Sequence, residues 1–321
     1  MDLTFQGRVK VPVITAPMFL VSCPKLALAT CAEGVIGSFP AHSTRTVDAF
    51  EEWLVEMEEG IAKLREAGGN PAPFAVNLVV NPTNPRFEGD LELCIKHKVE
   101  LVLTSKGAPN EVFKHIHRYG GRAFHDVAFK RHAEKALAAG ADGIIAVCSG
   151  AGGHTGQVNP FALVNEIREI SDKPIILAGG LSTGHDVAVA QAMGANMAYM
   201  GTRFLAAEEV LAPDAYREMV VDCEAKDIYY TTALDGFPIN IMVPSLEHST
   251  VSFEQLKSMT ASEKLDSHQM KDRFKNIWSA GHGVGMVQSK EAAGDICVRL
   301  REEYEQALSS IQQLMATNSG V

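Results

Sequence analysis

The segment Ala146–Gly156 reads AVCSGAGGHTG, and two related segments follow it, LAGG at Leu177–Gly180 and MGT at Met200–Thr202. Each combines a short apolar run with a glycine-bearing turn, and the gaps between them leave room for a helix. Short apolar runs are typical of parallel strands that are buried on both faces. The three segments therefore predict consecutive strand and helix units of an α/β fold, with the glycine turns at one end of the sheet.

The same alternation of strand and helix extends from the amino end to about residue 205. Two helix-to-strand turns, Ala139–Asp142 and Met193–Asn196, have similar sequences, which favours a repeated barrel over an open doubly wound sheet. The predicted fold class is α/β, a (β/α)8 TIM barrel, because eight such units close a barrel. The eight expected strands are Val11–Ala16, Val35–Phe39, Phe74–Val80, Leu101–Thr104, Arg122–Val127, Gly143–Cys148, Pro174–Ala178 and Met197–Met200.

The chain divides into three predicted parts. Residues 1–207 form the barrel. In residues 208–289 the alternation stops and the chain becomes more polar, which predicts an inserted lid or small second domain with a charged helix at Ser262–Lys275. Residues 290–321 contain a last amphipathic segment, which we expect to be a helix that packs back on the barrel.

Composition restricts the partners of this 321-residue chain. Its net charge of −10 would repel nucleic acid and anionic membranes, and its apolar runs are shorter than the ~18 residues of a membrane span. Six scattered cysteines without CxxC spacing, and no apolar signal segment, indicate a cytoplasmic protein with reduced thiols. We expect a small-molecule substrate, with neither nucleic acid nor membrane as partner. The oligomeric state stays open, a homo-oligomer being one alternative.

The turns after the seventh and eighth strands predict a phosphate site. Backbone N–H groups bind phosphate there in many barrels, because glycine lets the main chain approach the anion. Gly179 and Gly180 follow the seventh strand and Gly201 the eighth, with Ser182 and Thr202 as further donors. Simple chain turns are the alternative. No GxGxxG after an early strand and no GxxxxGK[ST] occur, so flavin mononucleotide (FMN) is the expected ligand.

His154 is the candidate catalytic base. It follows the sixth strand among Gly150, Gly152, Gly153 and Gly156, a setting that would hold the imidazole over a flat cofactor. An imidazole suits the removal of a proton from a carbon acid. A surface histidine without a task is the alternative.

Metal and nucleophile chemistry have weaker candidates. His125 and Asp126 could join His154 on a metal only if they converge with it, so we expect no metal. Cys148 ends a buried strand and is interpreted as an inert small apolar residue.

Two more segments are candidates for cofactor contact. Asn77 places an amide inside the apolar run FAVNLVV, where it needs hydrogen-bond partners that a flavin edge or neighbouring loops would supply. Ala16, Pro17 and Met18 follow the first strand and offer an apolar surface for a flat ring. An ordinary packed turn is the alternative.

The motifs resemble the nitronate monooxygenase family (2-nitropropane dioxygenases), which shares its barrel with flavin-dependent enoyl-ACP reductases and NADH:quinone reductases. The matching segments are PVITAPM, FAVNLVV, AGGHTG, PIILAGGLSTG, ANMAYMGTRFLA, GFPIN and IWSAGHGVG. The resemblance implies non-covalent FMN and a catalytic base at His154. It also implies cofactor contacts at Ala16, Pro17, Met18, Asn77, His125, Gly152, Ala178, Gly179, Gly180, Gly201 and Thr202.

Two departures from the family pattern stand out. Many relatives carry a flavin-contacting lysine after the fifth strand, where this chain has His125 and Asp126. A glutamate often precedes the AGGH run, where this chain has Gly150.

By resemblance, the expected reaction is oxidation of an alkyl nitronate, or of a nitroalkane deprotonated by His154, with dioxygen to a carbonyl compound and nitrite. A different reaction class is an NAD(P)H-dependent flavin reductase that acts on a quinone or an enoyl thioester. A third alternative is a barrel that binds a phosphorylated ligand without catalysis.

Overall fold

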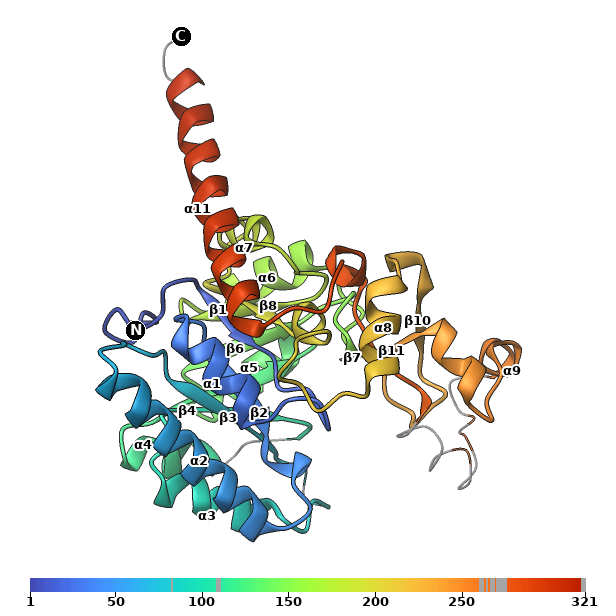
Figure 1. Cartoon of the computed structure of the whole chain (residues 1–321), viewed down its shortest axis with the longest axis horizontal. Helices are drawn as coiled ribbons and strands as arrows, with labels where there is room; N and C mark the ends of the chain where they lie inside the picture. Colours follow the sequence, from blue (N-terminus) through green and yellow to red (C-terminus); the bar gives the residue numbers. More distant parts are fainter. Residues whose placement is uncertain are drawn as a thin grey trace.

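Eight parallel strands form the barrel of this computed structural model, which describes residues 1–81, 83–107, 111–259 and 276–318, with Glu263, Leu265 and Gln269 (Figure 1). The spatial order is β1-β9-β8-β6-β5-β4-β3-β2, and a bridge between Ile14 and Ile36 brings the two ends of the sheet together. The predicted (β/α)8 barrel is therefore confirmed. The strands are β1 Val13–Thr15, β2 Gly37–Pro40, β3 Phe74–Val79, β4 Leu101–Ser105, β5 Arg122–Val127, β6 Gly143–Val147, β8 Ile175–Ala178 and β9 Met197–Met200.

Every expected strand overlaps an observed one, and the bounds differ by at most two residues. The helices cover the outside of the barrel, as Figure 1 shows. They are α1 Pro24–Ala32, α2 Val47–Glu66, α3 Phe87–Lys96, α4 Val112–Arg118, α5 Lys130–Ala138, α6 Pro160–Arg168 and α7 Gly184–Ala192. Among the described residues, no helix has the length and apolar character that crossing a membrane requires.

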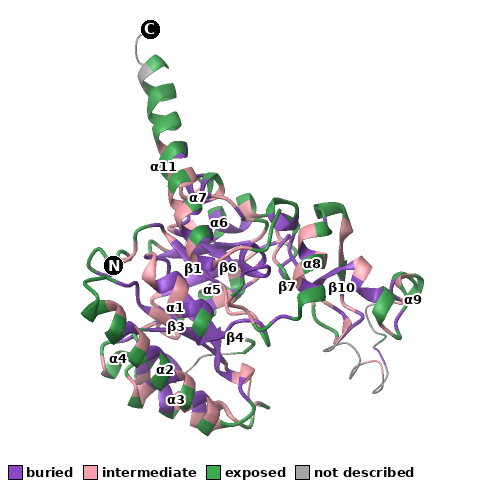
Figure 2. Ribbon diagram, viewed as in Figure 1, coloured by how far each residue is buried: buried purple, intermediate pink, exposed green. Residues whose placement is uncertain are grey.

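Side chains alternate between the inside of the barrel and the helix layer, because successive residues of a strand point to opposite faces. The inward residues include Ala75, Leu103, Phe124, Ile145 and Met197, which pack as one buried cluster. Outward residues such as Val76 and Val102 pack against the helices. The strands are buried on both faces (Figure 2), so the lower barrel is a filled core and a ligand can enter only at the strand ends.

A second, three-stranded sheet lies beside the barrel. It pairs β10 Ile228–Thr231 and β11 Ile239–Met242 with β7 Gly153–His154, in the order β10-β11-β7. The glycine-rich run around His154 is thus partly a strand, which the sequence reading did not predict. Residues 208–289 also contribute α8 Asp214–Asp222 and α9 Phe253–Ser258. The helix expected at Ser262–Lys275 lies outside the described residues apart from Glu263, Leu265 and Gln269, and movement of this part as a lid stays a prediction.

The last helix, α11 Ala293–Asn318, packs against α7 through its first half. Gly184 lets the two backbones meet, since a Cβ there would lie 2.2 Å from the carbonyl oxygen of Leu300. Tyr304 donates a hydrogen bond to Gln191 Oε1 at 2.7 Å. Beyond these contacts α11 extends away from the barrel (Figure 1), and Leu314 and Met315 are exposed.

Candidate active site

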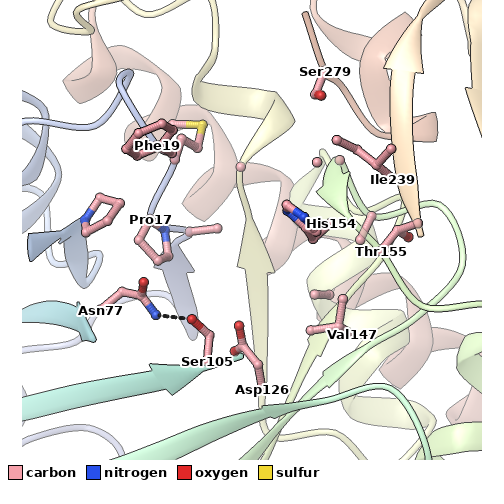
Figure 3. A pocket seen from close by; sticks show the side chains of 18 of the residues that line it. Pro17, Phe19, Asn77, Ser105, Asp126, Val147, His154, Thr155, Ile239 and Ser279 are labelled. Carbon is pink, nitrogen blue, oxygen red and sulfur yellow. Dashed lines mark hydrogen bonds between the residues drawn. The ribbon is translucent and has the colours of Figure 1, made fainter. Parts of the chain in front are cut away.

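A cavity of about 1360 Å³ opens at the carboxyl ends of the barrel strands. In Figure 3, Pro17 and Phe19 lie on one side and His154, Thr155 and Ile239 on the other. Inward residues near the carboxyl ends of six strands form its floor, because the apolar core fills the barrel below them. These residues are Asn77, Ser105, Asp126, Val147, Ala178 and Tyr199.

The amide of Asn77 is held in one orientation on this floor. Its Nδ2 group donates to the carbonyl oxygen of Leu103 and to Ser105 Oγ, both at 3.1 Å. The amide oxygen points away from Ser105 (Figure 3), toward the space above the floor. Neighbouring groups therefore satisfy the donor side of Asn77, and the acceptor side remains for a ligand.

Two floor groups are buried without a partner. Asp126 Oδ1 and the Tyr199 hydroxyl have no hydrogen bond within the described chain. Burial raises the pKa of Asp126 to about 7 and raises the pKa of Tyr199 well above its ordinary value. Buried polar groups of this kind are rare in proteins unless a ligand or water completes them. The floor fits a ligand whose ring edge carries N–H and C=O groups.

The predicted phosphate loop after β8 has the geometry of an anion cradle. Gly180 adopts φ of 75°, in the left-handed region that favours glycine. A Cβ at Gly180 would meet nothing within 4 Å, so the space beside it is open. Within the described chain, the N–H groups of Gly179 and Gly180 have no acceptor. Unpaired backbone donors beside open space fit a phosphate group.

Three glycine loops meet above this cradle. A Cβ on Gly152 would lie 2.8 Å from the Gly281 nitrogen and 3.1 Å from Thr202 Oγ1, so only glycine fits there. The Gly281 N–H donates to Thr202 Oγ1 at 2.8 Å, which leaves the hydroxyl hydrogen of Thr202 for another acceptor. The tertiary structure thus brings Gly152, Gly201 and Thr202 together with Gly179 and Gly180 along the cavity.

Ala16, Pro17 and Met18 line the opposite side of the cavity. The Ala16 N–H donates to the Met200 carbonyl at 2.9 Å, and the Met18 N–H donates to Ser22 Oγ at 2.9 Å. The first bond joins the turn after β1 to the end of β9, and the second lies within the segment between β1 and α1. A fixed, half-buried apolar strip therefore faces the wall that carries His154.

His154 lies on β7, where it pairs with Ile239 of β11. Its Nε2 atom is 3.0 Å from Asp235 Oδ2 and 3.3 Å from Lys106 Nζ. The ring makes an edge contact with Phe237 at a centroid distance of 6.2 Å. Among the described residues Nδ1 of His154 has no hydrogen-bond partner. A neutral imidazole that donates Nε2–H to Asp235 therefore keeps a lone pair on Nδ1 for a substrate proton.

Sequence reasoning missed Lys106 and Asp235. Lys106 follows β4, and Asp235 precedes the GFPIN segment. Their only sequence signal is a charged residue next to a strand end or a recognised motif, which surface residues also show. Their shared contact with His154 becomes visible only once β11 is paired with β7.

His125 lies on the outward side of β5. Its Nδ1 is 2.8 Å from Thr104 Oγ1, and its ring packs edge-on against Phe113 of α4. Burial lowers the pKa of His125 to about 4, so it is neutral at pH 7. The residue borders the cavity, but its strand neighbour Asp126 provides the inward group. The predicted cofactor contact at His125 stays a prediction.

Cys148 is buried beneath the glycine loop, where its Sγ faces the Ala146 carbonyl at 3.5 Å. Burial raises the pKa of this thiol to about 12. A thiol that keeps its proton is a poor nucleophile at neutral pH. The arrangement agrees with the interpretation of Cys148 as a packing residue.

Comparison with known proteins gives consistent matches. A family model described as nitronate monooxygenase matches residues 82–303. A nitronate monooxygenase of Neurospora crassa is 26% identical over 95% of this chain and 92% of its own length. A 5-hydroxy-7a-methyl-1-oxo-octahydro-1H-indene-4-carboxyl-CoA dehydrogenase of Rhodococcus jostii is 29% identical over 77% of this chain and 68% of its own.

Among solved structures, a nitroalkane oxidase from Streptomyces ansochromogenes superposes with a TM-score of 0.80. It is 24% identical, and the match covers 95% of this chain and 99% of that one. This similarity concerns the fold. The named relatives are oxidoreductases, and this chain is an enzyme of that class.

Proposed function

Because the chain belongs to the nitronate monooxygenase family, we propose that it is an FMN-dependent oxidoreductase. Its substrates are alkyl nitronates, or nitroalkanes that it first deprotonates, and dioxygen completes their oxidation to a carbonyl compound and nitrite. The observation that carries the proposal is the position of His154. An imidazole with a carboxylate at 3.0 Å on Nε2 faces a cavity whose floor and loops suit a flavin mononucleotide.

The donor set supports FMN in three places. The N–H groups of Gly179 and Gly180 and the hydroxyl of Thr202 would hold the phosphate. Asn77, Asp126 and Tyr199 on the floor would meet the polar edge of the ring, which satisfies atoms that are otherwise buried alone. Ala16, Pro17 and Met18 would cover one face of the ring. Bound there, FMN would accept electrons from the substrate and pass them to dioxygen.

The side chains of His154 and Asp235 carry out the proton transfer. Asp235 accepts Nε2–H from His154 and so selects the tautomer whose Nδ1 lone pair is available. A nitroalkane with its acidic carbon at Nδ1 loses that proton to the imidazole, and Asp235 then stabilises the positive charge on the ring. The filled barrel core below the floor excludes water from that side. The part 208–289, which carries Asp235 and Phe237, would act as the lid over the substrate.

One experiment tests the cofactor and the reaction together. The purified protein should be yellow and release FMN on denaturation, which mass spectrometry identifies. Under anaerobic conditions a propionate 3-nitronate type substrate should bleach the flavin, and NAD(P)H should not. A colourless protein that takes up no FMN would contradict the proposal.

The Rhodococcus jostii match supports a second candidate, because that relative is named as a dehydrogenase of a CoA thioester. An NAD(P)H-dependent flavin reductase that acts on an enoyl thioester or a quinone would use the same cavity. Rapid bleaching by NAD(P)H alone, without a response to the nitronate, would favour it.

A further inference from the structure

Lys106 places a cation beside the candidate base. It follows directly after β4 and adopts φ of 55°, a left-handed conformation that is uncommon for a residue with a side chain. The turn directs the side chain across the cavity, where Nζ lies 3.3 Å from His154 Nε2. Lysine 106 and Lys135 are the two lysines among the described residues that line the cavity. Of these two lysines, Lys106 is the one that contacts His154.

The hydrogen-bonding chemistry of Lys106, His154 and Asp235 limits the role of the contact between Lys106 and His154. An ammonium group only donates hydrogen bonds, and Nε2 that donates to Asp235 cannot accept one. When Nε2 of His154 carries the hydrogen and Nδ1 is the base, His154 therefore accepts no hydrogen bond from the Lys106 ammonium group. A positive charge is instead present within one hydrogen-bond length of the ring that removes the proton.

Removal of a proton from a carbon acid creates an anion next to the base. For a nitroalkane the C–H bond breaks, its proton goes to His154 Nδ1, and its electron pair forms the C=N bond of the nitronate. The negative charge then lies on the two nitro oxygens. A preorganised cation stabilises such a developing charge more than it stabilises the neutral substrate.

We propose that Lys106 binds the oxygens of a nitro or nitronate group, and that this ammonium selects planar oxyanions as ligands of the site. The inference deepens the proposed function and rests on it for the identity of the substrate. The anion site itself is a property of the residues, so it is testable by binding alone. The alternative is that the Lys106 charge serves only to balance the Asp235 carboxylate, and the test must distinguish this role from anion binding.

Nitrate is a suitable probe, because it is a planar oxyanion with the oxygen arrangement of a nitro group. Calorimetric titration of the purified holoenzyme should detect nitrate binding. K106M and K106Q remove the charge, and like the parent they place a residue with a side chain at this positive φ. Either variant therefore serves if the other fails to fold. Each should weaken nitrate binding by about tenfold or more, as expected for loss of a hydrogen bond to a charged group.

Two controls accompany these variants. K106R keeps a cation, and K135M removes the other cavity lysine, which does not contact His154; both should bind nitrate within about threefold of the parent. The proposal is overturned if the parent does not bind nitrate, if K106M and K106Q bind it as tightly as the parent, or if K135M weakens binding equally.

Kinetics then separate this inference from the proposed function. With an alkyl nitronate, K106M should lower kcat/KM and flatten its dependence on ionic strength. If the parent oxidises no nitronate but nitrate binding still depends on Lys106, the proposed function fails and the anion site stands. If the parent oxidises nitronates and K106M leaves both KM and nitrate affinity unchanged, the anion site fails and the proposed function stands.

Discussion

Asp235 Oδ2 lies 3.0 Å from Nε2 of His154, although the two residues are 81 positions apart in the sequence. The carboxylate belongs to the turn between β10 and β11, and the imidazole belongs to β7, which pairs with β11. The small sheet therefore places the carboxylate beside the candidate base. The side chain of Asp235 is 18% exposed and that of His154 36%, so the pair is shielded on one side and open to the cavity on the other.

We expect D235N to lower kcat/KM for a neutral nitroalkane by about tenfold or more, because an amide can hold the imidazole in the wrong tautomer. The pH profile of kcat/KM should change shape, whereas flavin content should not. D235E should restore part of the activity. An unchanged pH profile in D235N would show that Asp235 has only a structural role.

His154→Asn should keep the flavin bound and lose about a hundredfold or more in turnover of a neutral nitroalkane, the usual size of a general-base contribution. With a preformed nitronate the loss should be smaller, since no proton has to be removed. Steady-state assays with both substrates measure the difference. Equal activity of variant and parent on the neutral substrate would eliminate His154 as the base.

Gly180→Asp should expel the cofactor, because a carboxylate would then face the phosphate across the open space beside Gly180. Gly180→Ala is the matched control. It carries the same left-handed strain, about 1 to 2 kcal/mol, without the charge, and should retain most of the flavin. The absorbance of the purified variants gives the flavin content. Full flavin in G180D would refute the cradle.

The stability of the cofactor-free protein should depend on Asp126. Burial raises its folded-state pKa to about 7 from an ordinary value of 3.8. Between these values the folded state binds a proton that the unfolded state lacks, so the contribution of Asp126 to stability falls as pH rises from about 4 to about 7.

D126N removes this titration. It should therefore stabilise the cofactor-free protein at pH 8 by roughly 4 kcal/mol, and the difference from the parent should shrink at pH 5. Chemical unfolding at both pH values measures it. A gap of the same size at pH 5 and pH 8 would contradict the raised pKa.

Much of the barrel could be predicted from local sequence. The runs Arg122–Val127 and Met197–Met200 are strands with the expected bounds, because a strand buried on both faces needs a continuous apolar stretch. The glycine turns after β8 and β9 were equally visible, since few residues other than glycine allow a backbone to approach an anion or adopt a positive φ. The prediction of His154 as the candidate base came from its glycine neighbours.

The orientation of the residues on the cavity floor could not be predicted from the sequence. Asp126 and His125 are adjacent, and only the register of β5 shows that Asp126 points to the floor while His125 contacts Thr104. A shift of one residue would exchange the two. The sequence nevertheless marked both positions as a departure from the family pattern.

By itself, the sequence determined the order of the barrel strands and helices, the glycine turns and the presence of a histidine beside them, because these depend on neighbours along the chain. Only the tertiary structure decided which charges meet that histidine. Lys106 and Asp235 come from the end of β4 and the turn before β11, and both contact His154 because β7, which follows the barrel strand β6 in the chain, pairs with β11 of the second sheet. Contacts between distant segments depend on strand register and chain packing, which no local pattern encodes.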